Sequence, residues 1–387
     1  MPTTDNNAIT VNGIVVVDLN QDLYANTITM RSIGYRGFYG TNAGYSFGGA
    51  NSAASPNPST FPSPTPAPVF TLRTEIESFP FASASVTISS VGSISTTRAA
   101  ITGHSSSTHG YAAGGSTSLT SASAYSNVID RFPFTTPFVT ASSVGTLATA
   151  RGSSAGCSGD GYGFVCTGLI TPATATNTVE RFSFASGTQN GAVVSPGPST
   201  RYSATGVSSG QNGYIVGATI PTPTTTVNII KFPFYNTNFR TTGVGNLLNP
   251  GTQRWNVGGI SSDTDGYIVG GQTSTTTGPS IGTLTAISKF PFATELTDAV
   301  DVGNLTTARS FMSTQSSDTF GYSLGGGSNG PSNYGNSPVS PVYLALANFG
   351  YTAQISTVER FPYATGTTSG SIGSLTTGKW GCAGAQY

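Results

Sequence analysis

The chain has 387 residues, a formal net charge of zero and 8% charged residues, against about 25% charged residues in typical soluble domains. A neutral chain offers no electrostatic footprint for nucleic acid or for an anionic membrane surface, and none of its apolar runs reaches the ~18 residues of a membrane span. Aromatic residues make up 10% of the chain, which argues against a disordered low-complexity protein. We therefore expect a folded protein with neither nucleic-acid nor membrane partners.

The N-terminal stretch lies outside the repeats that fill the rest of the chain. Residues 1–30 lack the basic region of a secretory signal. They contain one short β-branched run, Ile14–Leu19, which favours a strand. We predict that residues 1–30 form an arm that docks on another chain, for example by strand addition.

Three sequence markers recur six times, in fixed order, after residue 30. A Gly-aromatic pair that precedes a small-residue doublet begins at Gly44, Gly110, Gly163, Gly213, Gly266 and Gly321. An aromatic triplet such as FPF begins at Phe79, Phe132, Phe182, Phe232, Phe290 and Phe361. A stretch that starts with VG in most copies ends at a basic residue, which is Arg98, Arg151, Arg201, Arg254, Arg309 or Lys379.

Each copy of the repeat reads as four antiparallel strands. The segment after the basic residue, a polar turn and the Gly-aromatic segment form a hairpin, and the Gly doublet ends its second strand, where positive φ or close approach is needed. A loop of variable length leads to a third strand with the aromatic triplet, and a fourth strand leads to the next basic residue. Four strands with a period of roughly 50–55 residues are typical of a β-propeller blade, so we predict an all-β propeller over residues 31–387.

The order of these markers resembles the kelch repeat, whose second strand also ends in a Gly doublet. The later Tyr and Trp of kelch are replaced by Phe-Pro-Phe, and Trp255 and Trp380 instead follow the basic position by one residue. The form [VI]-x-[RK]-F-P-F-A…VG-L-T-T-x-R…SS…GY…GG is similar to the kelch-like repeat proteins of tailed bacteriophages, notably those of marine cyanobacteria. This resemblance covers residues 31–387 and implies a virion protein.

The number of blades follows from the number of copies. Six aromatic triplets predict six blades. The last stretch, Lys379–Tyr387, reads as a first strand with no second strand after it, so we expect it to close the ring by pairing into the first copy. The segment MRSIGYRGFYGTNAGY over residues 30–45 could instead supply that strand or belong to a seventh blade, which keeps seven blades as the alternative.

No catalytic or metal-binding constellation stands out, although some kelch-type propellers are copper enzymes. His104 and His109 have no recurring thiolate or carboxylate partner, and sister copies lack the acids that Asp263 and Asp265 would bring to a calcium loop. No paired acids, nucleophile elbow or phosphate loop is found. We therefore expect no catalytic residue, metal or cofactor, with a carbohydrate-active or copper-type propeller enzyme as the alternative of another class.

Three cysteines, Cys157, Cys166 and Cys382, are too few for a disulfide framework. Cys157 and Cys166 could face each other across a hairpin. Whether they are bonded is left open, with two free thiols as the preferred interpretation.

Eleven of the fifteen Lys and Arg residues occupy two positions of the repeat. One set precedes the aromatic triplets and comprises Arg131, Arg181, Lys231, Lys289 and Arg360. The other set opens the first strands and forms a candidate basic ring at the channel mouth, comprising Arg98, Arg151, Arg201, Arg254, Arg309 and Lys379. This ring would clamp an anionic or carbonyl-rich partner. The alternative, which we prefer, is that each cation braces the propeller by bonding loop carbonyls.

The loops between second and third strands vary most in length. They are long at residues 50–75 and 327–357, in the first and sixth copies, which a closed ring would place side by side. Their aromatic residues form a candidate patch for a partner or receptor, made of Phe61, Phe70, Tyr334, Tyr343, Phe349 and Tyr351.

These features favour a non-enzymatic virion protein, assembled in the host cytoplasm and present in multiple copies. We expect the platform of a phage tail fibre, baseplate or tail-associated adhesin for attachment or host-receptor binding. The arm would contact other virion proteins, and a host surface glycan or receptor is a candidate partner. A head or neck decoration or connector protein is the runner-up.

Overall fold

The computed structural model describes residues 8–11, 14–18, 40–52, 70–118, 124–135, 140–159, 161–171, 174–185, 190–197, 199–218, 229–235, 241–247, 254–274, 281–294, 297–328, 353–363 and 369–387. Every regular element in these ranges is a β-strand. The chain divides into residues 1–36 and residues 37–387, where the sequence had suggested a boundary at residue 30. In the first unit, β1 (Ala8–Val11) and β2 (Ile14–Asp18) form an antiparallel hairpin, so the expected single strand has a partner.

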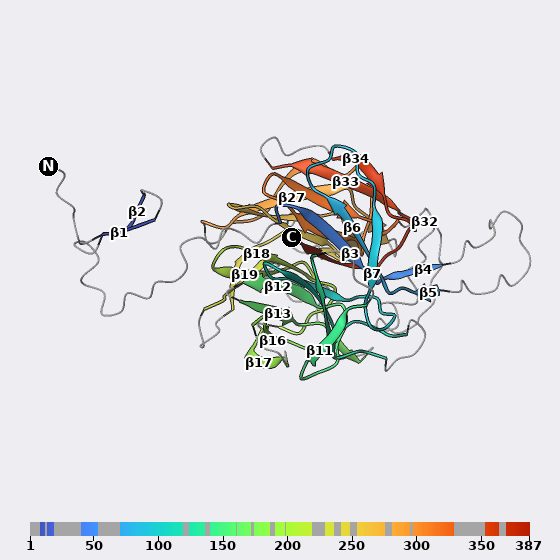
Figure 1. Cartoon of the computed structure of the whole chain (residues 1–387), viewed down its shortest axis with the longest axis horizontal. Coiled ribbons are helices and arrows are strands. Elements are labelled where there is room, and N and C mark those ends of the chain that lie inside the picture. Colours follow the sequence, from blue (N-terminus) through green and yellow to red (C-terminus); the bar gives the residue numbers. More distant parts are fainter. Residues whose placement is uncertain are drawn as a thin grey trace, which may run out of the picture. The chain divides into compact units, whose positions relative to one another are not determined.

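The described part of the second unit contains six four-stranded antiparallel sheets, numbered I to VI (Figure 1). Sheet I consists of β35 (Ala383–Gln386), β3 (Ala43–Phe47), β6 (Glu75–Pro80) and β7 (Ser89–Ser93). Sheet II consists of β8 (Thr102–Ser105), β9 (His109–Ala113), β10 (Val128–Pro133) and β11 (Ser142–Thr146). Sheet III consists of β12 (Ala155–Gly159), β13 (Tyr162–Cys166), β16 (Thr178–Ser183) and β17 (Ala192–Pro196). Sheet IV consists of β18 (Thr205–Ser208), β19 (Asn212–Val216), β20 (Ile229–Pro233) and β21 (Thr242–Gly245). Sheet V consists of β23 (Gly258–Ser261), β24 (Asp265–Val269), β27 (Ala286–Pro291) and β28 (Val300–Asn304). Sheet VI consists of β29 (Ser313–Ser316), β30 (Phe320–Leu324), β33 (Thr357–Pro362) and β34 (Gly370–Ser374).

Smaller sheets are formed by the segments between second and third strands, joined in sheet V by β22 (Arg254–Trp255), which precedes the first strand. Two-stranded ribbons are formed by β4 (Ala50–Ser52) with β5 (Phe70–Leu72), by β14 (Leu169–Thr171) with β15 (Thr174–Ala175), and by β31 (Gly327–Ser328) with β32 (Ala353–Gln354). A three-stranded one joins β22, β25 (Gln272–Ser274) and β26 (Ile281–Thr283). These ribbons form the base of the loops that differ in length between copies.

The first strands of the six sheets contact one another in a closed cycle. β8 contacts β12, and the series continues through β18, β23, β29 and β35 back to β8. The C-terminal strand β35 completes sheet I by pairing with β3, as expected for the stretch that ends the sequence. The ring is therefore closed by segments from the two ends of the second unit.

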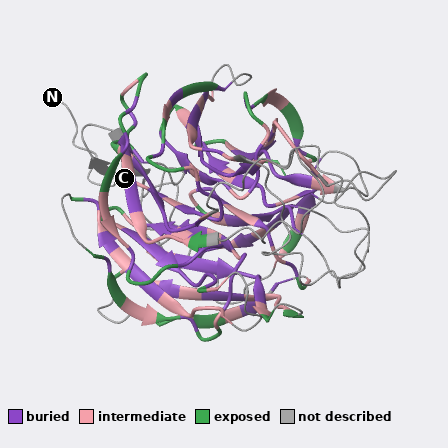
Figure 2. Cartoon of the chain, turned by 90° about the vertical axis from the view of Figure 1, so that its right-hand side faces the viewer, coloured by how far each residue is buried: buried purple, intermediate pink, exposed green. Residues whose placement is uncertain are grey.

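Burial decreases from the inner to the outer strands of each sheet. The second strand β9 is buried over Gly110–Ala113, whereas the fourth strand β11 contains no buried residue. Figure 2 shows the same gradient, with buried segments on the inner strands and exposed segments at the outer edges. Inner strands have neighbours on both faces, which explains why their residues read as nearly continuous small or apolar runs.

The aromatic triplets pack between neighbouring sheets. Phe132 and Phe134 of sheet II lie 5.8 and 5.0 Å, ring centre to ring centre, from Tyr45 of sheet I, and both are buried. Equivalent trios link every adjacent pair of sheets around the cycle. The glycine of each Gly-aromatic pair makes room for the first ring: a Cβ on Gly110 would lie 2.2 Å from the Phe132 ring. The aromatic triplets therefore hold neighbouring sheets together by packing between them.

Candidate functional site: the central channel and its buried ion pairs

The six residues of the candidate basic ring are all buried, with exposed fractions between 0 and 8%. The clamp interpretation needs cations that a partner can reach, and these side chains are directed into the protein instead. Their contacts correspond to the bracing alternative. The six residues are Arg98, Arg151, Arg201, Arg254, Arg309 and Lys379.

Arg98 shows how the brace is built. Its Nη1 donates to the carbonyl oxygens of Gly114 (2.7 Å) and Val128 (2.9 Å), at the ends of the second and third strands of sheet II. Its Nη2 donates to Asp130 Oδ2 at 2.6 Å. The same oxygen accepts the Ser95 amide (3.0 Å) and hydroxyl (2.8 Å) from the segment that arrives from sheet I. Burial lowers the pKa of Arg98, and Asp130 opposes this shift.

The same ion pair recurs in three other sheets. Arg151 pairs with Glu180 and Arg309 with Glu359, and all four side chains are almost completely buried. Lys379 Nζ lies 2.8 Å from Glu77 Oε2. Burial acts to raise the pKa of Glu77, but Lys379 and hydrogen bonds from Thr376 outweigh it and lower that pKa.

A β-bulge positions each of these acids. The pairing between third and fourth strands shifts register immediately before the acid in all four sheets, for example between Ile129 and Asp130. Such bulges redirect a side chain. These acids were not expected as partners of the basic ring, although each stands two residues before an aromatic triplet in the sequence. They are Glu77, Asp130, Glu180 and Glu359.

Sheets IV and V lack the acid at this position. Ile230 occupies it in sheet IV, and the guanidinium of Arg201 bonds the Ser199 hydroxyl at 2.7 Å. In sheet V, Arg254 Nη1 donates to Ser288 Oγ at 2.7 Å, and Ser288 donates to Asp301 Oδ1 at 2.6 Å. Burial lowers the pKa of both arginines to about 10, with Asp301 opposing the shift for Arg254.

Two closed rings of hydrogen bonds surround the channel. In the first, which we call the positive-φ ring, each residue two places after a basic residue donates its N–H to the carbonyl oxygen of its neighbour at 2.8–3.1 Å. All six have φ between 51° and 65°, a conformation that is strained for non-glycine residues. The closed ring of bonds holds this backbone in place. Its members are Ala100, Ser153, Ser203, Asn256, Phe311 and Gly381.

The second ring lies five residues further along each first strand, and we call it the serine ring. Each main-chain N–H donates to the side-chain oxygen of the next member at 2.9–3.2 Å. The C-terminal member, Gln386, supplies Oε1 where the other members supply a serine hydroxyl. The ring comprises Ser105, Ser158, Ser208, Ser261, Ser316 and Gln386.

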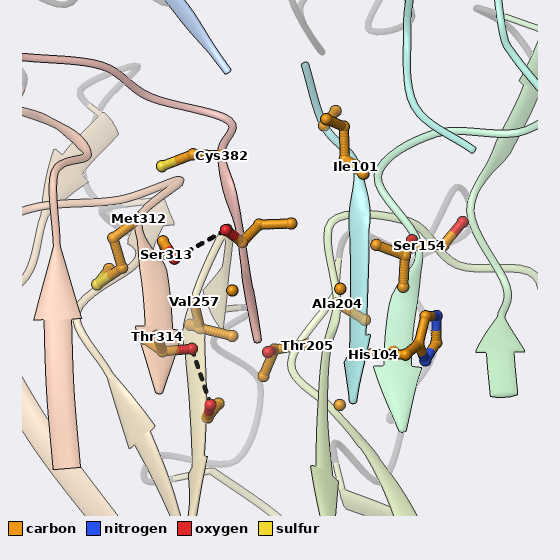
Figure 3. Close-up of a pocket in the computed structure, with 18 of the residues that line it drawn as sticks. Ile101, His104, Ser154, Ala204, Thr205, Val257, Met312, Ser313, Thr314 and Cys382 are labelled. Atoms are coloured by element: carbon orange, nitrogen blue, oxygen red, sulfur yellow. Dashed lines mark hydrogen bonds between the residues drawn. The ribbon is translucent and has the colours of Figure 1, made fainter. Parts of the chain in front are cut away.

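The channel holds a cavity of about 160 Å³ between and around these rings. Figure 3 shows Ile101, Ala204, Val257, Met312 and Cys382 around it, from five different sheets. Between the two rings lies a third layer, which we call the collar. The strands approach so closely there that a Cβ on Gly206 would lie 1.9 Å from the carbonyl oxygen of Gly156. The collar comprises Gly103, Gly156, Gly206, Gly259, Thr314 and Gly384. In sheet VI this position is Thr314, whose hydroxyl donates to the carbonyl oxygen of Gly259 at 2.8 Å. No described Asp, Glu, Lys or Arg lines the cavity.

The bases of the loops with variable length lie on the side of the positive-φ ring. Residues that directly follow the basic position pair with residues that directly follow the Gly doublets, as Trp380 does with Ala50 and Ser310 with Gly327. Sheets I and VI are neighbours in the cycle, so the bases of the two long loops belong to adjacent sheets. Of the aromatic patch, the structure describes only the backbone of Phe70, in β5. The other five members lie outside the described residues: Phe61, Tyr334, Tyr343, Phe349 and Tyr351.

The two histidines of sheet II differ in burial and in their hydrogen-bond partners. His104 is buried, its Nδ1 lies 3.1 Å from the carbonyl oxygen of Cys157, and burial lowers its pKa to about 4. His109 is partly exposed, and its Nδ1 lies 2.8 Å from the Thr108 hydroxyl. Within the ranges that the structure describes, no three His, Cys, Asp or Glu residues are grouped to hold a metal ion.

The remaining residues singled out by sequence have ordinary surroundings. Cys157, Cys166 and Cys382 are buried free thiols, and Cys157 pairs with Phe164 in the ladder, so it does not stand opposite Cys166. Asp265 Oδ2 accepts the Thr264 hydroxyl at 2.8 Å and lies 3.8 Å from Lys289 Nζ. The described part of the chain contains no helix with the length and hydropathy that a membrane crossing requires.

Comparison with known proteins gives the fold and no family. No protein-family model and no curated protein sequence matches the chain. Among solved structures, "Structure of YjhT" is similar, with a TM-score of 0.54 and 11% sequence identity over 66% of this chain and 85% of that one. YjhT is a β-propeller-like protein. At this identity the likeness concerns the fold alone, and this chain has an all-β, β-propeller-like fold.

Proposed function

We propose that the chain is a six-bladed, kelch-like propeller that serves as a non-enzymatic platform in a tailed-phage virion. The six sheets would be the six blades, and the protein would belong to a tail fibre, baseplate or tail-associated adhesin. Support for six blades comes from the six four-stranded sheets and from both hydrogen-bond rings, which each take one member from every sheet.

One observation carries the platform function: the basic ring, its partner acids and the ring serines all bond other groups inside the fold. The basic residues and their acids are buried against each other, and the ring serines bond neighbouring strands. Variation in length is concentrated in loops over one side of the ring. A rigid disc with free variation on one side suits a protein whose task is to present a contact surface.

Immunogold labelling of purified particles tests the proposal, with antibodies raised against the recombinant chain. Label on the tail would support it. Label confined to the head or neck would favour a decoration or connector protein instead. Absence of the chain from purified particles, checked by mass spectrometry, would overturn the virion assignment.

The N-terminal arm is the proposed attachment to other virion proteins. Its hairpin of β1 and β2 belongs to a unit separate from the sheets, and a two-stranded hairpin is marginal by itself. Deleting residues 1–20 should leave the disc folded, as judged by its far-ultraviolet spectrum, and should abolish incorporation into particles. Normal incorporation of the truncated chain would refute this role.

The long loops at residues 50–75 and 327–357 are the proposed contact surface for a partner subunit or a host glycan or receptor. Aromatic, proline-containing loops supply contact area at limited entropy cost. Replacing either loop with the short Ala218–Ile229 connection of the fourth copy should preserve folding and weaken adsorption. If both shortened variants assemble and adsorb like the parent, the loops have no such role.

A further inference from the structure

Among the residues that the structure describes, only groups without charge at neutral pH line the channel cavity. The six cations stand two residues before the positive-φ ring in sequence, yet their donors bond carbonyls, hydroxyls and acids within the sheets. His104, which also lines the cavity, is neutral above its pKa of about 4. A charged ligand would lose its hydration here without meeting a counter-charge, and that loss is costly. The chemistry of the wall therefore selects a neutral ligand.

The positive-φ ring has a polar half and an apolar half. The hydrogen bonds fix the order of its members, so Ser153, Ser203 and Asn256 are consecutive. The remaining consecutive members, Phe311, Gly381 and Ala100, complete the circle. All six residues line the cavity. The side chains of one arc offer hydroxyls and an amide, and the opposite arc offers a partly exposed phenyl ring packed on Trp380 at 6.0 Å between ring centres.

Two polar atoms in the polar half lack a partner among the described residues. These are Ser153 Oγ and Asn256 Oδ1, in side chains that are 6% and 4% exposed. Buried polar atoms are nearly always hydrogen-bonded, and an unmade bond costs free energy. Both residues line the cavity, which makes a ligand that bonds them in the channel the natural partner.

The size of the cavity limits what it can hold. Its volume is about 160 Å³, and a cavity of about 150 Å³ in another protein accommodates benzene. The space therefore fits one six-membered ring with small substituents and excludes a longer chain.

We propose that the channel, at its positive-φ ring, binds one neutral pyranose-sized sugar residue, such as the terminal residue of an uncharged glycan. The hydroxyls of Ser153 and Ser203 and the amide oxygen of Asn256 bond the hydroxyls of the sugar, while the Asn256 amide nitrogen donates to Gln272 Oε1 at 2.7 Å. Phe311 packs against its C–H face, as aromatic rings do at sites with one apolar and one polar side. The inference stands on the channel alone and holds whether or not the chain belongs to a virion.

The test uses glycine substitutions, because glycine keeps the positive φ of the ring backbone while removing the side chain. The full-length S153G/S203G/N256G variant removes the polar arc. Thr167→Gly is the matched control, because Thr167 is also a non-glycine residue at positive φ (60°) but is not among the residues that line the cavity. Binding of glucose, galactose, mannose and N-acetylglucosamine is measured by saturation-transfer NMR and calorimetry, with glucuronate as the charged counterpart of glucose.

At least one neutral sugar should bind with a Kd of about 1 mM or tighter, and the triple variant should weaken that Kd by about tenfold or more. Thr167→Gly should leave the Kd unchanged, and glucuronate should bind more weakly than glucose. The sugar should also slow labelling of Cys382, which lines the cavity, by a small thiol reagent. No binding by any of the four sugars, or equal binding by the parent and a folded triple variant, would overturn the proposal. The proposal would also be overturned if sugar binding were lost only on shortening the long loops at residues 50–75 and 327–357, and not in the triple variant.

Discussion

The most informative perturbation is the removal of one buried charge from the Arg98–Asp130 pair. Both side chains are 0% exposed. In Asp130→Asn the shape is kept, but the guanidinium loses its counter-charge, and the oxygen that holds the Ser95 amide and hydroxyl becomes a weaker acceptor. Breaking a buried ion pair from one side typically costs about 3–5 kcal/mol, so the free energy of unfolding should fall by that amount.

Sheet IV supplies the matched control, because Arg201 has Ile230 where an acid stands elsewhere. Arg201→Met removes a buried cation that has only hydroxyl partners for its side chain among the described contacts. It should therefore cost less than about 1 kcal/mol or even stabilise, since desolvation of the charge is no longer required. The double variant Arg98→Met/Asp130→Leu should recover part of the loss. Full recovery is not expected, because the Gly114 and Val128 carbonyls and the Ser95 amide lose their partner.

Urea unfolding measures these differences, followed by both tryptophan fluorescence and circular dichroism. Coincident transitions are required before a single free energy is assigned. A loss below about 1 kcal/mol for Asp130→Asn, or an equal loss for Arg201→Met, would contradict the view that the acids compensate the buried cations.

Three further predictions concern pH, packing and closure. His104 has a folded-state pKa of about 4, below its ordinary 6.5, so the unfolded chain binds more protons than the folded chain between these two pH values. The free energy of unfolding should therefore fall by roughly 3 kcal/mol as the pH drops through this window. His104→Gln should remove this part of the pH dependence, as measured by urea titrations at several pH values. Phe290→Ala removes a ring that is 2% exposed and lies 5.3 Å, ring centre to ring centre, from Tyr214. It should lower the free energy of unfolding, measured in urea, by about 3–5 kcal/mol, whereas Tyr235→Ala, at an exposed position, should change it little. Deleting residues 381–387 removes one member of each ring and the first strand of sheet I; cooperative thermal unfolding should be lost, whereas Gln386→Ala should only lower the Tm.

Much of the architecture could be predicted because local periodicity determines it. The Gly-aromatic pair, the triplet and the basic residue recur at positions where one strand meets the next, and each has a steric or hydrogen-bonding reason within its own copy. The role of the C-terminal stretch followed from counting, since one first strand was left over. Gly114 and Gly115 also have the positive φ expected at the end of a second strand.

The partners of the basic ring could not be predicted in the same way. Asp130 lies 32 residues after Arg98, and only the bulge between Ile129 and Asp130 turns its carboxylate toward the guanidinium. A bulge depends on how two strands pair and has no marker in the copy itself. The two rings were missed for a related reason, because each bond joins residues in different copies and exists only when the cycle is closed.

The three layers of the channel differ in how far their residues vary, and the backbone explains the difference. In the collar, five of six positions are glycine, since a side chain there would strike the neighbouring strand. In the serine ring five of six are serine, because that side chain closes the bond to the next strand. In the positive-φ ring the bonds are made by main-chain atoms alone, and its positions hold five residue types: Ala100, Ser153, Ser203, Asn256, Phe311 and Gly381.

A layer whose closure needs no side chain leaves its side chains to serve another purpose. Non-glycine residues at positive φ carry a strain of about 1–2 kcal/mol each, which glycine would relieve at every position of this ring. Five positions nevertheless carry a side chain: three of these form the polar arc, and a fourth is the phenyl ring of Phe311. The ligand proposed for the channel would account for this departure from glycine.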